Sequence, residues 1–358
     1  MKRTQIYPII QALLAAFLFG ASAPLSKLLL DEIAPIPMAA LLYLGSGLGL
    51  AVYQVARRTS GRASDAEAHI SRADVRWVIG ALLAGGVVAP IVLMFSLRAT
   101  PAATASLLLN FEGVATTLIA AWVFKEAIGR RVWWAVALIT LASVILTWEP
   151  SGVWGISWGA LGVLGACVLW GLDNNLTRNV SAKDPLVIVT IKGLGAGSFS
   201  LLLALALRNP FPRWPALLLA LLLGSVSYGL GIVFYILALR GLGAARTSVL
   251  YGTAPFVGAL LSFLLFRDRV QPAFVAAFVI MLIGAGLLLG ESHAHPHLHP
   301  ALRHEHRHQH DDGHHAHSHA EDVAPDIVHA HEHEHETVEH THPHAPDIHH
   351  RHVHHEGE

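Results

Sequence analysis

Two acidic residues and one lysine lie inside long apolar runs of the sequence. Glu112 is near the middle of the run 101–124, Asp173 is near the end of the run 157–179, and Lys192 lies in the run 185–207. A charge in hydrocarbon costs a few kcal/mol, so it needs a partner or water, and such residues commonly mark ion or substrate pathways. At Glu112 this favours a proton or cation site over a protonated acid bonded to a neighbouring helix. At Asp173, a substrate or coupling site and a helix end in the headgroup region fit equally well.

Other polar residues extend this predicted site. The lysine could neutralise either acid or bind a substrate carboxylate. Ser22 aligns with Asp173 when the first part of the chain is laid on the second, and Tyr251 and Thr253 lie beside Pro255, where a span is expected to kink near a cavity. Hydrogen bonding between helices is an equally good interpretation of Tyr251 and Thr253. The predicted substrate-binding or coupling residues are Glu112, Asn110, Asp173, Asn174, Lys192, Ser22, Tyr251 and Thr253.

Histidine is concentrated at the C-terminal end of the chain. Of 25 histidines, all but His69 lie between His293 and His355, many of them in His-x-His runs. Neutral imidazole is a good ligand for Zn, Ni, Co and Cu, and a flexible chain can gather several around one ion. A polar, pH-responsive tether is the alternative to a physiological role in metal binding. The predicted metal ligands are His293, His295, His297, His299, His304, His306, His308, His310, His329, His331, His333 and His335.

The composition is that of a membrane protein. Hydrophobic residues make up 53% and charged residues only 14% of the 358 residues, and the net charge of −1 gives no reason to expect a nucleic-acid partner. The single Cys167 cannot form a disulfide within the chain. Runs long enough to span a bilayer must be helical, because lipid offers no partner for backbone polar groups. Ten such runs are expected, at about 8–30, 34–55, 75–97, 101–124, 131–148, 157–179, 185–207, 214–239, 244–266 and 272–290.

The hydrophobic region contains an internal repeat. Leu97-Arg98 and the residues that follow it match Leu239-Arg240, and the register holds without a gap to Phe124-Lys125, which falls on Phe266-Arg267. Many secondary transporters are built from such duplicated units. The predicted domains are a first five-helix repeat at 1–150, a second at 151–291, and a tail at 292–358. The tail nearly lacks large apolar residues, so it is expected to be disordered.

Five spans per repeat is an odd number, so the second repeat must enter the membrane from the opposite side. In the first half the basic residues gather before the first span, between the second and third, and between the fourth and fifth. By the positive-inside rule these segments are cytoplasmic. The sequence therefore predicts an all-α polytopic protein of the cell (inner) membrane. Its ten transmembrane helices form two inverted five-helix repeats, and both termini are cytoplasmic.

Ten spans in two repeats resemble the EamA-type transporters of the drug/metabolite transporter superfamily. The family's repeat typically carries a proline in its fourth span and a short charged step before the fifth. Thr253-Ala254-Pro255-Phe256 and Arg267-Asp268-Arg269 fit that pattern in the second repeat, and Lys125-Glu126 fits the step in the first. Gly113 stands where the first-repeat proline would be, which indicates a subfamily with a special fourth span. The resemblance implies transport of metabolites or drugs, and it does not name a substrate.

The function expected from these features is secondary transport of small organic solutes, with export as the favoured direction. The chain has no phosphate-binding loop and no soluble domain for ATP, so ion coupling or facilitation must drive it. No covalent catalysis and no required cofactor are expected, and the partners are lipid, a small-molecule substrate and divalent ions at the tail. The alternatives are a Ni, Co or Zn exporter that collects metal with the tail, and a membrane metal sensor or buffer. Substrate and oligomeric state stay open.

Overall fold

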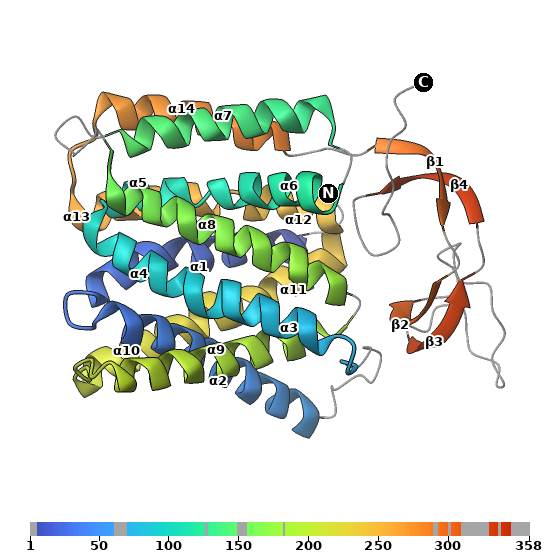
Figure 1. The fold of residues 1–358 in the computed structure, drawn as a ribbon, viewed down its shortest axis with the longest axis horizontal. Helices are drawn as coiled ribbons and strands as arrows, with labels where there is room; N and C mark the ends of the chain where they lie inside the picture. The colour runs from blue at the N-terminus through green and yellow to red at the C-terminus, as the bar shows by residue number, and fades with distance from the viewer. Residues whose placement is uncertain are drawn as a thin grey trace.

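The computed structural model describes residues 6–60, 70–125, 128–148, 156–181 and 183–288, and four segments of the tail at 293–299, 302–308, 329–335 and 338–344. Its hydrophobic part is a bundle of helices that run in nearly the same direction or its reverse (Figure 1). The helices of the first half are α1 (Ile6–Leu29), α2 (Pro35–Thr59), α3 (Val75–Ala81), the π-helical η2 (Leu82–Val88), α4 (Ala89–Ala99), α5 (Ala102–Leu108), α6 (Phe111–Val123) and α7 (Arg130–Thr147).

The second half has the same series of elements. They are α8 (Trp158–Thr177), the short 3₁₀ helix η4 (Arg178–Val180), α9 (Pro185–Ala206), α10 (Trp214–Leu223), the π-helical η5 (Gly224–Leu230), α11 (Gly231–Leu242), α12 (Ala244–Tyr251), α13 (Ala254–Phe266) and α14 (Pro272–Leu288). Prolines lie in the first turn of α2, α9, α10 and α13, where the missing N–H leaves no hydrogen bond unmade.

Local irregularities recur at the spacing that the sequence repeat has. The two π-helical segments, η2 and η5, begin 142 residues apart. The helix is also interrupted at equivalent places, after α5 at residues 109–110 and after α12 at residues 252–253. Lys125, just after α6, and Arg267, just after α13, are again 142 residues apart, and both have a positive φ of 54°. The duplicated sequence thus produces a duplicated backbone.

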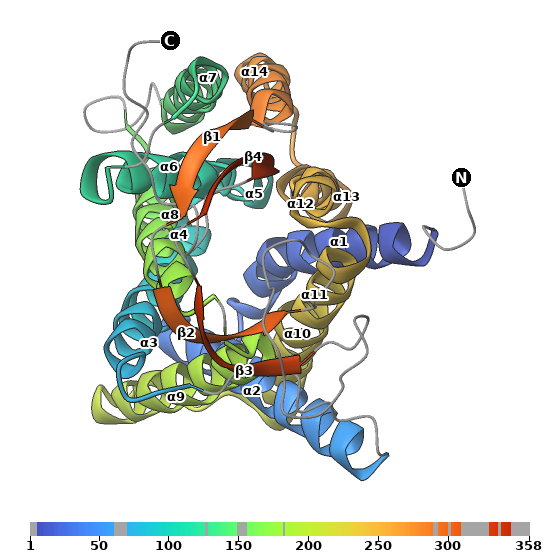
Figure 2. The same cartoon turned by 90° about the vertical axis from the view of Figure 1, so that its right-hand side faces the viewer.

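Packing between the halves is reciprocal (Figure 2). Helix α2 packs on α9 and α7 on α14, so these equivalent helices pair with each other, and α5 also packs on α13. Helix α1 packs on α11 and α13, and its counterpart α8 packs on α4 and α6. Exchanging the halves therefore reproduces these contacts of α1 and α8. Viewed along the helices, α6 and α8 lie on one side of the bundle, and α1, α11 and α12 lie on the other.

Glycines allow α2 and α9 to cross closely. A Cβ on Gly47 would lie 2.6 Å from the backbone nitrogen of Leu194, and a Cβ on Gly193 would lie 2.7 Å from that of Gly47. Small residues at such crossings let helix backbones approach. Partners farther along the two helices run in opposite senses, because Leu44 lies against Gly197 and Gln54 donates to Thr190 Oγ1 at 2.6 Å. The two helices are therefore antiparallel.

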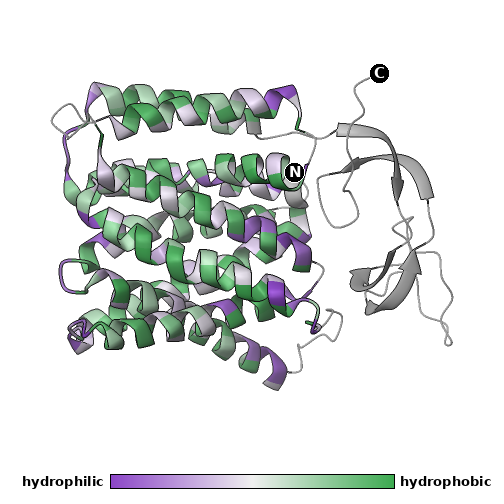
Figure 3. Ribbon diagram, in the orientation of Figure 1, coloured by the Kyte–Doolittle hydropathy of each residue, from purple (hydrophilic) through white to green (hydrophobic). Residues whose placement is uncertain are grey.

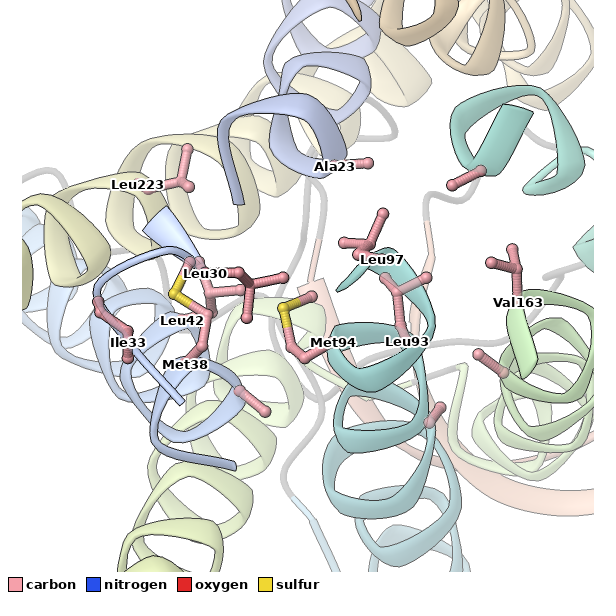
Figure 4. Close-up of a cluster of buried hydrophobic side chains, with 14 of the residues drawn as sticks. Ala23, Leu30, Ile33, Met38, Leu42, Leu93, Met94, Leu97, Val163 and Leu223 are labelled. Atoms are coloured by element: carbon pink, nitrogen blue, oxygen red, sulfur yellow. The ribbon is translucent and has the colours of Figure 1, made fainter. Parts of the chain in front are cut away.

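Buried aliphatic side chains hold the bundle together (Figure 4). The largest cluster joins α1, α2, α4, α8 and α10, with Met38 and Leu42 packed toward Leu93 and Met94. A second cluster, which includes Ile139, joins α5, α6 and α7 to α13 and α14. Many large hydrophobic side chains of the helices, such as Leu202 and Leu264, are exposed. Hydrophilic residues are concentrated near the helix ends (Figure 3). This distribution is that of a protein surrounded by lipid.

Eight helical segments of the described chain are long and apolar enough to cross a membrane. They are 6–29, 35–59, 75–99, 102–123, 130–147, 185–206, 214–242 and 246–266. Helix α8 has 20 residues but contains the polar run Asp173-Asn174-Asn175, and α14 is a shorter apolar helix. These are the sixth and tenth of the predicted spans, so length and composition alone do not establish all ten.

The tail differs from the expectation of a segment without regular structure. It contains four short strands, β1 (His293–His299), β2 (Leu302–His308), β3 (His329–His335) and β4 (Val338–His344), which pair antiparallel as β1–β4 and β2–β3. The strands lie beyond the ends of the helices, on the side where α2 and α14 end (Figure 1). An alternating sequence fits the two-residue period of a strand, although the near absence of apolar residues had favoured disorder.

Candidate functional site

Glu112 lies in the first turn of α6, directly after the interruption of the helix at residues 109–110. The backbone tightens there, with N–H groups of Asn110, Glu112 and Gly113 bonding three residues back. The sequence predicts Glu112 to be in mid-span, but it does not predict that a helix begins there. Backbone N–H groups at a helix start favour a negative charge. The side chain is partly exposed, and its Oε1 accepts a hydrogen bond from Asn174 Nδ2 at 2.9 Å.

Asp173 and Lys192 form an ion pair between α8 and α9. Lys192 Nζ lies 2.6 Å from Asp173 Oδ1 and 2.7 Å from Oδ2, and the two side chains are 15% and 9% exposed. Thr177 Oγ1 also donates to Asp173 Oδ1 at 2.9 Å. The carboxylate packs against Gly85 of η2, where a Cβ would lie 1.9 Å from Oδ2. In the structure, Lys192 therefore neutralises Asp173.

Glu112 and this ion pair belong to one group of polar residues. Thr116, one turn after Glu112 in α6, accepts from Asn174 Nδ2 at 3.2 Å, and its carbonyl accepts from Asn175 Nδ2 at 3.0 Å. Asn174, which donates to Glu112, directly follows Asp173 in α8. The polar run of α8 therefore joins α6 to α9, and four of the predicted site residues, Glu112, Asp173, Asn174 and Lys192, come together.

The π-helical segment η2 supplies a carbonyl group to the same region. Gly85 O accepts from Tyr43 Oη at 2.7 Å and from Trp170 Nε1 at 2.9 Å. A π segment inside an α-helix is common at functional sites and releases carbonyl groups from the regular ladder. Sequence reasoning missed Tyr43, Trp170 and Thr116. These three side chains can form hydrogen bonds and lie within apolar runs of the sequence. Such residues are too common in those runs to be identified as site residues on that ground alone.

Ser22 and Tyr251 belong to α1 and α12, on the side of the bundle opposite to α6 and α8 (Figure 2). Ser22 is buried and shares a side-chain hydrogen bond with Tyr228 of η5. The rings of Tyr228 and Tyr251 lie on either side of Phe19 of α1, with centroids 5.8 Å and 5.6 Å from its own. Ser22 thus occupies in the first half the place that Asp173 has in the second, next to the equivalent π segment.

Asn110 and Thr253 are not brought into the group. Asn110 Nδ2 donates to Leu107 O at 3.0 Å and lies 3.3 Å from Met281 Sδ of α14. Thr253 is exposed and donates to the nearby Leu250 O at 2.6 Å. Both residues lie at the helix interruptions and bond within them. The hydrogen bonds thus account for the two residues as parts of the backbone irregularities.

The predicted metal ligands lie apart from the helices, on the tail strands. Their backbones are described in β1, β2 and β3, whereas His310 lies outside the described residues. The register pairs histidine with histidine at three positions of each ladder. The pairs are His293–His344, His295–His342 and His297–His340 in one, and His304–His333, His306–His331 and His308–His329 in the other.

The charges of the group define what it can bind. Asp173 is neutralised by two contacts with Lys192, whereas the side-chain partner of Glu112 in the described structure is the uncharged amide of Asn174. In the part of the chain that the structure describes, the Glu112 carboxylate therefore makes no direct contact with a cationic side chain. Such a group can take up and release a proton, or exchange the proton for a cation, at the centre of a helical bundle.

Similar proteins support a transport function. The EamA-like transporter family model matches residues 6–148 and again 157–290. An uncharacterized transporter of Methanothermobacter thermautotrophicus is 25% identical over 296 residues, which cover 79% of this chain and 86% of that protein. An uncharacterized protein of Pseudomonas aeruginosa is 31% identical over 190 residues, or 52% of this chain and 65% of that protein.

A solved crystal structure has the same fold. It matches with a TM-score of 0.56 at 17% identity, and covers 78% of this chain and 96% of its own. The two matches of the family model divide the chain where its duplicated backbone does, at the segment between α7 and α8. With its apolar helices, the chain is a multi-pass membrane transporter, without enzymatic activity, and it belongs to the EamA-like transporter family.

Proposed function

We propose that this protein is a secondary transporter that exports small organic solutes by alternating access, driven by an ion gradient through Glu112. The observation that carries the proposal is the carboxylate of Glu112 at a helix interruption inside a span, with the Asp173–Lys192 ion pair beside it. Discontinuous helices at mid-membrane are typical of the binding sites of secondary transporters. Rocking of one half against the other around this group would expose it alternately to each side.

Proteoliposome flux tests this proposal. Solutes that accumulate in cells lacking the protein, found by untargeted metabolite profiling, are loaded into vesicles that contain the purified full chain. An imposed pH gradient should then drive their movement, and collapse of the gradient should slow it. Efflux from cells that carry the protein, compared with cells that lack it, decides the direction. A protein that moves no such solute in vesicles, with or without a gradient, contradicts the proposal.

We further propose ten spans in two inverted repeats, with both termini in the cytoplasm. The antiparallel crossing of α2 and α9 supports inversion, because equivalent helices of inverted repeats run in opposite directions. We expect reporter fusions at Gly61 and after Glu291 both to report the cytoplasm, as the basic loops of the first half predict. An external signal at either position would overturn the topology.

The tail is proposed to bind divalent metal such as Zn, Ni, Co or Cu, and to be dispensable for folding of the helices. The histidine pairs in the register of both ladders support this. Among the residues that the structure describes, no group of three or more His, Cys, Asp and Glu side chains is placed to hold a metal ion.

Removal of residues 292–358 should therefore abolish high-capacity Ni or Zn binding and leave a folded transporter. The affinity of the full chain should fall as the pH drops through about 6.5, because imidazole binds metal only when neutral. Calorimetry on the full chain and on the truncated form measures both effects. If the truncated form holds as much metal as the full chain, the tail is not the metal site.

A further inference from the structure

Two basic side chains join the ends of α1 and α4. Lys27 Nζ, in the last turn of α1, donates to Leu97 O at 2.7 Å and also to Thr100 O at the end of α4. In return, Arg98 Nη2, in the last turn of α4, donates at 2.9 Å to Leu30 O, just beyond the end of α1. The contact is therefore reciprocal, because each helix supplies the cation that caps the other.

This contact offsets an unfavourable arrangement of helix dipoles. Both helices end at the same end of the bundle, so the partial negative charges of their last carbonyl groups lie near each other. Lysine and arginine side chains at a helix C-terminus bond the last carbonyl groups and balance this charge. Leu30, Leu97 and Thr100, whose carbonyl groups accept, are buried, so the two cations take the place of water there.

Other helices meet at the same end, which is here called the outer end. Helix α1 also packs on α5, and α5 packs on α13. The start of α8 lies against the end of α4, where a Cβ on Gly159 would clash with Thr100 Oγ1. In Figure 1 this is the end of the bundle that carries the labels α4, α5 and α13. Helices from opposite sides of the bundle are thus in direct contact at the outer end.

The opposite end of the bundle, here called the inner end, lacks the equivalent contacts. The repeat relates α1 to α8, α4 to α11, α5 to α12 and α13 to α6. In the part of the chain that the structure describes, α8 makes no comparable contact with α11 or α12, and α6 makes none with α12. Viewed from the inner end, α6 and α8 lie apart from α11 and α12 (Figure 2). The two ends therefore differ, although the two halves of the sequence are equivalent.

The repeat also places basic residues at the inner end. Arg178, which aligns with Lys27, directly follows α8. Arg240, which aligns with Arg98, lies in the last turn of α11. The guanidinium group of Arg178 lies over the ring of Phe124, 5.9 Å from its centroid, at the end of α6. In this conformation Arg178 thus contacts α6, on its own side of the bundle.

We propose that Lys27 and Arg98 form an outer latch that closes the outer end, and that Arg178 and Arg240 close the inner end in the alternate conformation. This rests on the alternating access proposed above and names the residues that gate it. In the proposed topology α1 begins in the cytoplasm, so the structure is open toward the cytoplasm. Release of the outer latch lets α1 and α4 separate, and the two arginines then cap α8 and α11 in the same reciprocal way.

The repeat names the acceptors expected in the alternate conformation. Leu239 and Leu242 align with the two residues whose carbonyl groups accept from Lys27, and Ser181 aligns with the residue whose carbonyl group accepts from Arg98. The carbonyl groups at these three positions, at the ends of α11 and α8, should accept from the two arginines when the inner end closes.

The test measures one distance across each end of the purified full chain in detergent. Pairs of nitroxide labels are attached to introduced cysteines and read by electron paramagnetic resonance, in a chain whose single, buried cysteine is replaced by Cys167→Ser. Exposed positions carry the labels. Glu32 and Trp158 span the outer end, and Ala73 and Arg246 span the inner end.

Loss of the outer latch should move the two distances in opposite directions. In the double variant Lys27→Met with Arg98→Met, the outer distance should lengthen and the inner distance should shorten. The ratio of the two populations should change at least about tenfold, because hydrogen bonds from charged donors are lost. Arg208→Met, which removes an exposed cation just after α9, is the matched control and should leave both distances unchanged.

A purely structural role of the two residues gives a different result. If the double variant unfolds at a lower temperature but keeps both distances, Lys27 and Arg98 only cap their helices and the proposal is overturned. If the double variant does not yield folded protein, Lys27→Met alone decides, with smaller shifts in the same directions expected.

The inner end is tested in the background of the double variant. Adding Arg178→Met and Arg240→Met should reverse the shortening of the inner distance, because neither end then has its latch. An inner distance that stays short contradicts the assignment of the two arginines.

These distances are measured without a substrate, so they are independent of the proposed transport. If the distances respond as expected but no solute moves in vesicles, the transport function fails and the latch stands. If solute moves in vesicles while the distances do not respond, the latch is wrong and the transport function stands.

Discussion

Replacement of Glu112 by glutamine is expected to uncouple transport from the pH gradient while leaving the protein inserted and folded. Glutamine keeps the hydrogen-bonding geometry toward Asn174, whose amide lies 2.9 Å from the Glu112 carboxylate, but it cannot exchange a proton. Gradient-driven flux in proteoliposomes should fall at least about tenfold, which is the equivalent of about 1.4 kcal/mol. Any residual flux should no longer depend on pH.

The matched control for this experiment is Glu32→Gln, which removes an exposed carboxylate between α1 and α2. It should transport like the wild type. Size-exclusion profiles of both variants in detergent show whether the helices have assembled. Wild-type flux with unchanged pH dependence in Glu112→Gln would reduce Glu112 to a structural acid, and the coupling site would have to be sought elsewhere.

Replacement of Lys192 by methionine is expected to destabilise the protein strongly. It removes the ammonium group that contacts both oxygens of Asp173 and leaves a largely buried carboxylate without its cation. Breaking a buried ion pair in this way costs about 3–5 kcal/mol. The midpoint of thermal unfolding in detergent should therefore fall by roughly 6 °C or more.

The double variant Asp173→Asn with Lys192→Met tests the cause. It removes both charges together, so most of the lost stability should return, because no unpaired charge remains. Lys183→Met is the comparison variant and should cost less than Lys192→Met, because Lys183 lies 3.8 Å from Asp74, too far for a hydrogen bond, and Asp74 keeps its two hydrogen bonds from Ser71. If the single and double variants unfold at the same temperature, the unpaired charge of Asp173 is not the cause of the lost stability.

The fold class was readable from the sequence, because it depends on quantities that the sequence carries directly. Helices are imposed wherever an apolar run is long enough to enter lipid, since backbone polar groups there can only bond within the segment. The repeat was visible in Arg98 and Arg240 and in Lys125 and Arg267, and the last pair recurs as equivalent backbone irregularities. The strands of the tail were not predicted, because strand pairing depends on partners far apart in the chain.

The candidate site divides in the same way. The sequence by itself placed Glu112, Asp173 and Lys192 within the spans, because a charge among apolar residues stands out at once. Which charge pairs with which was decided by the tertiary structure alone. Lys192 of α9 reaches Asp173 of α8, and Glu112, at the start of α6, is left with an amide. Five aromatic side chains likewise come together from five helical segments, and no local pattern records distances between residues so far apart in the chain. They are Phe19, Tyr43, Tyr228, Tyr235 and Tyr251.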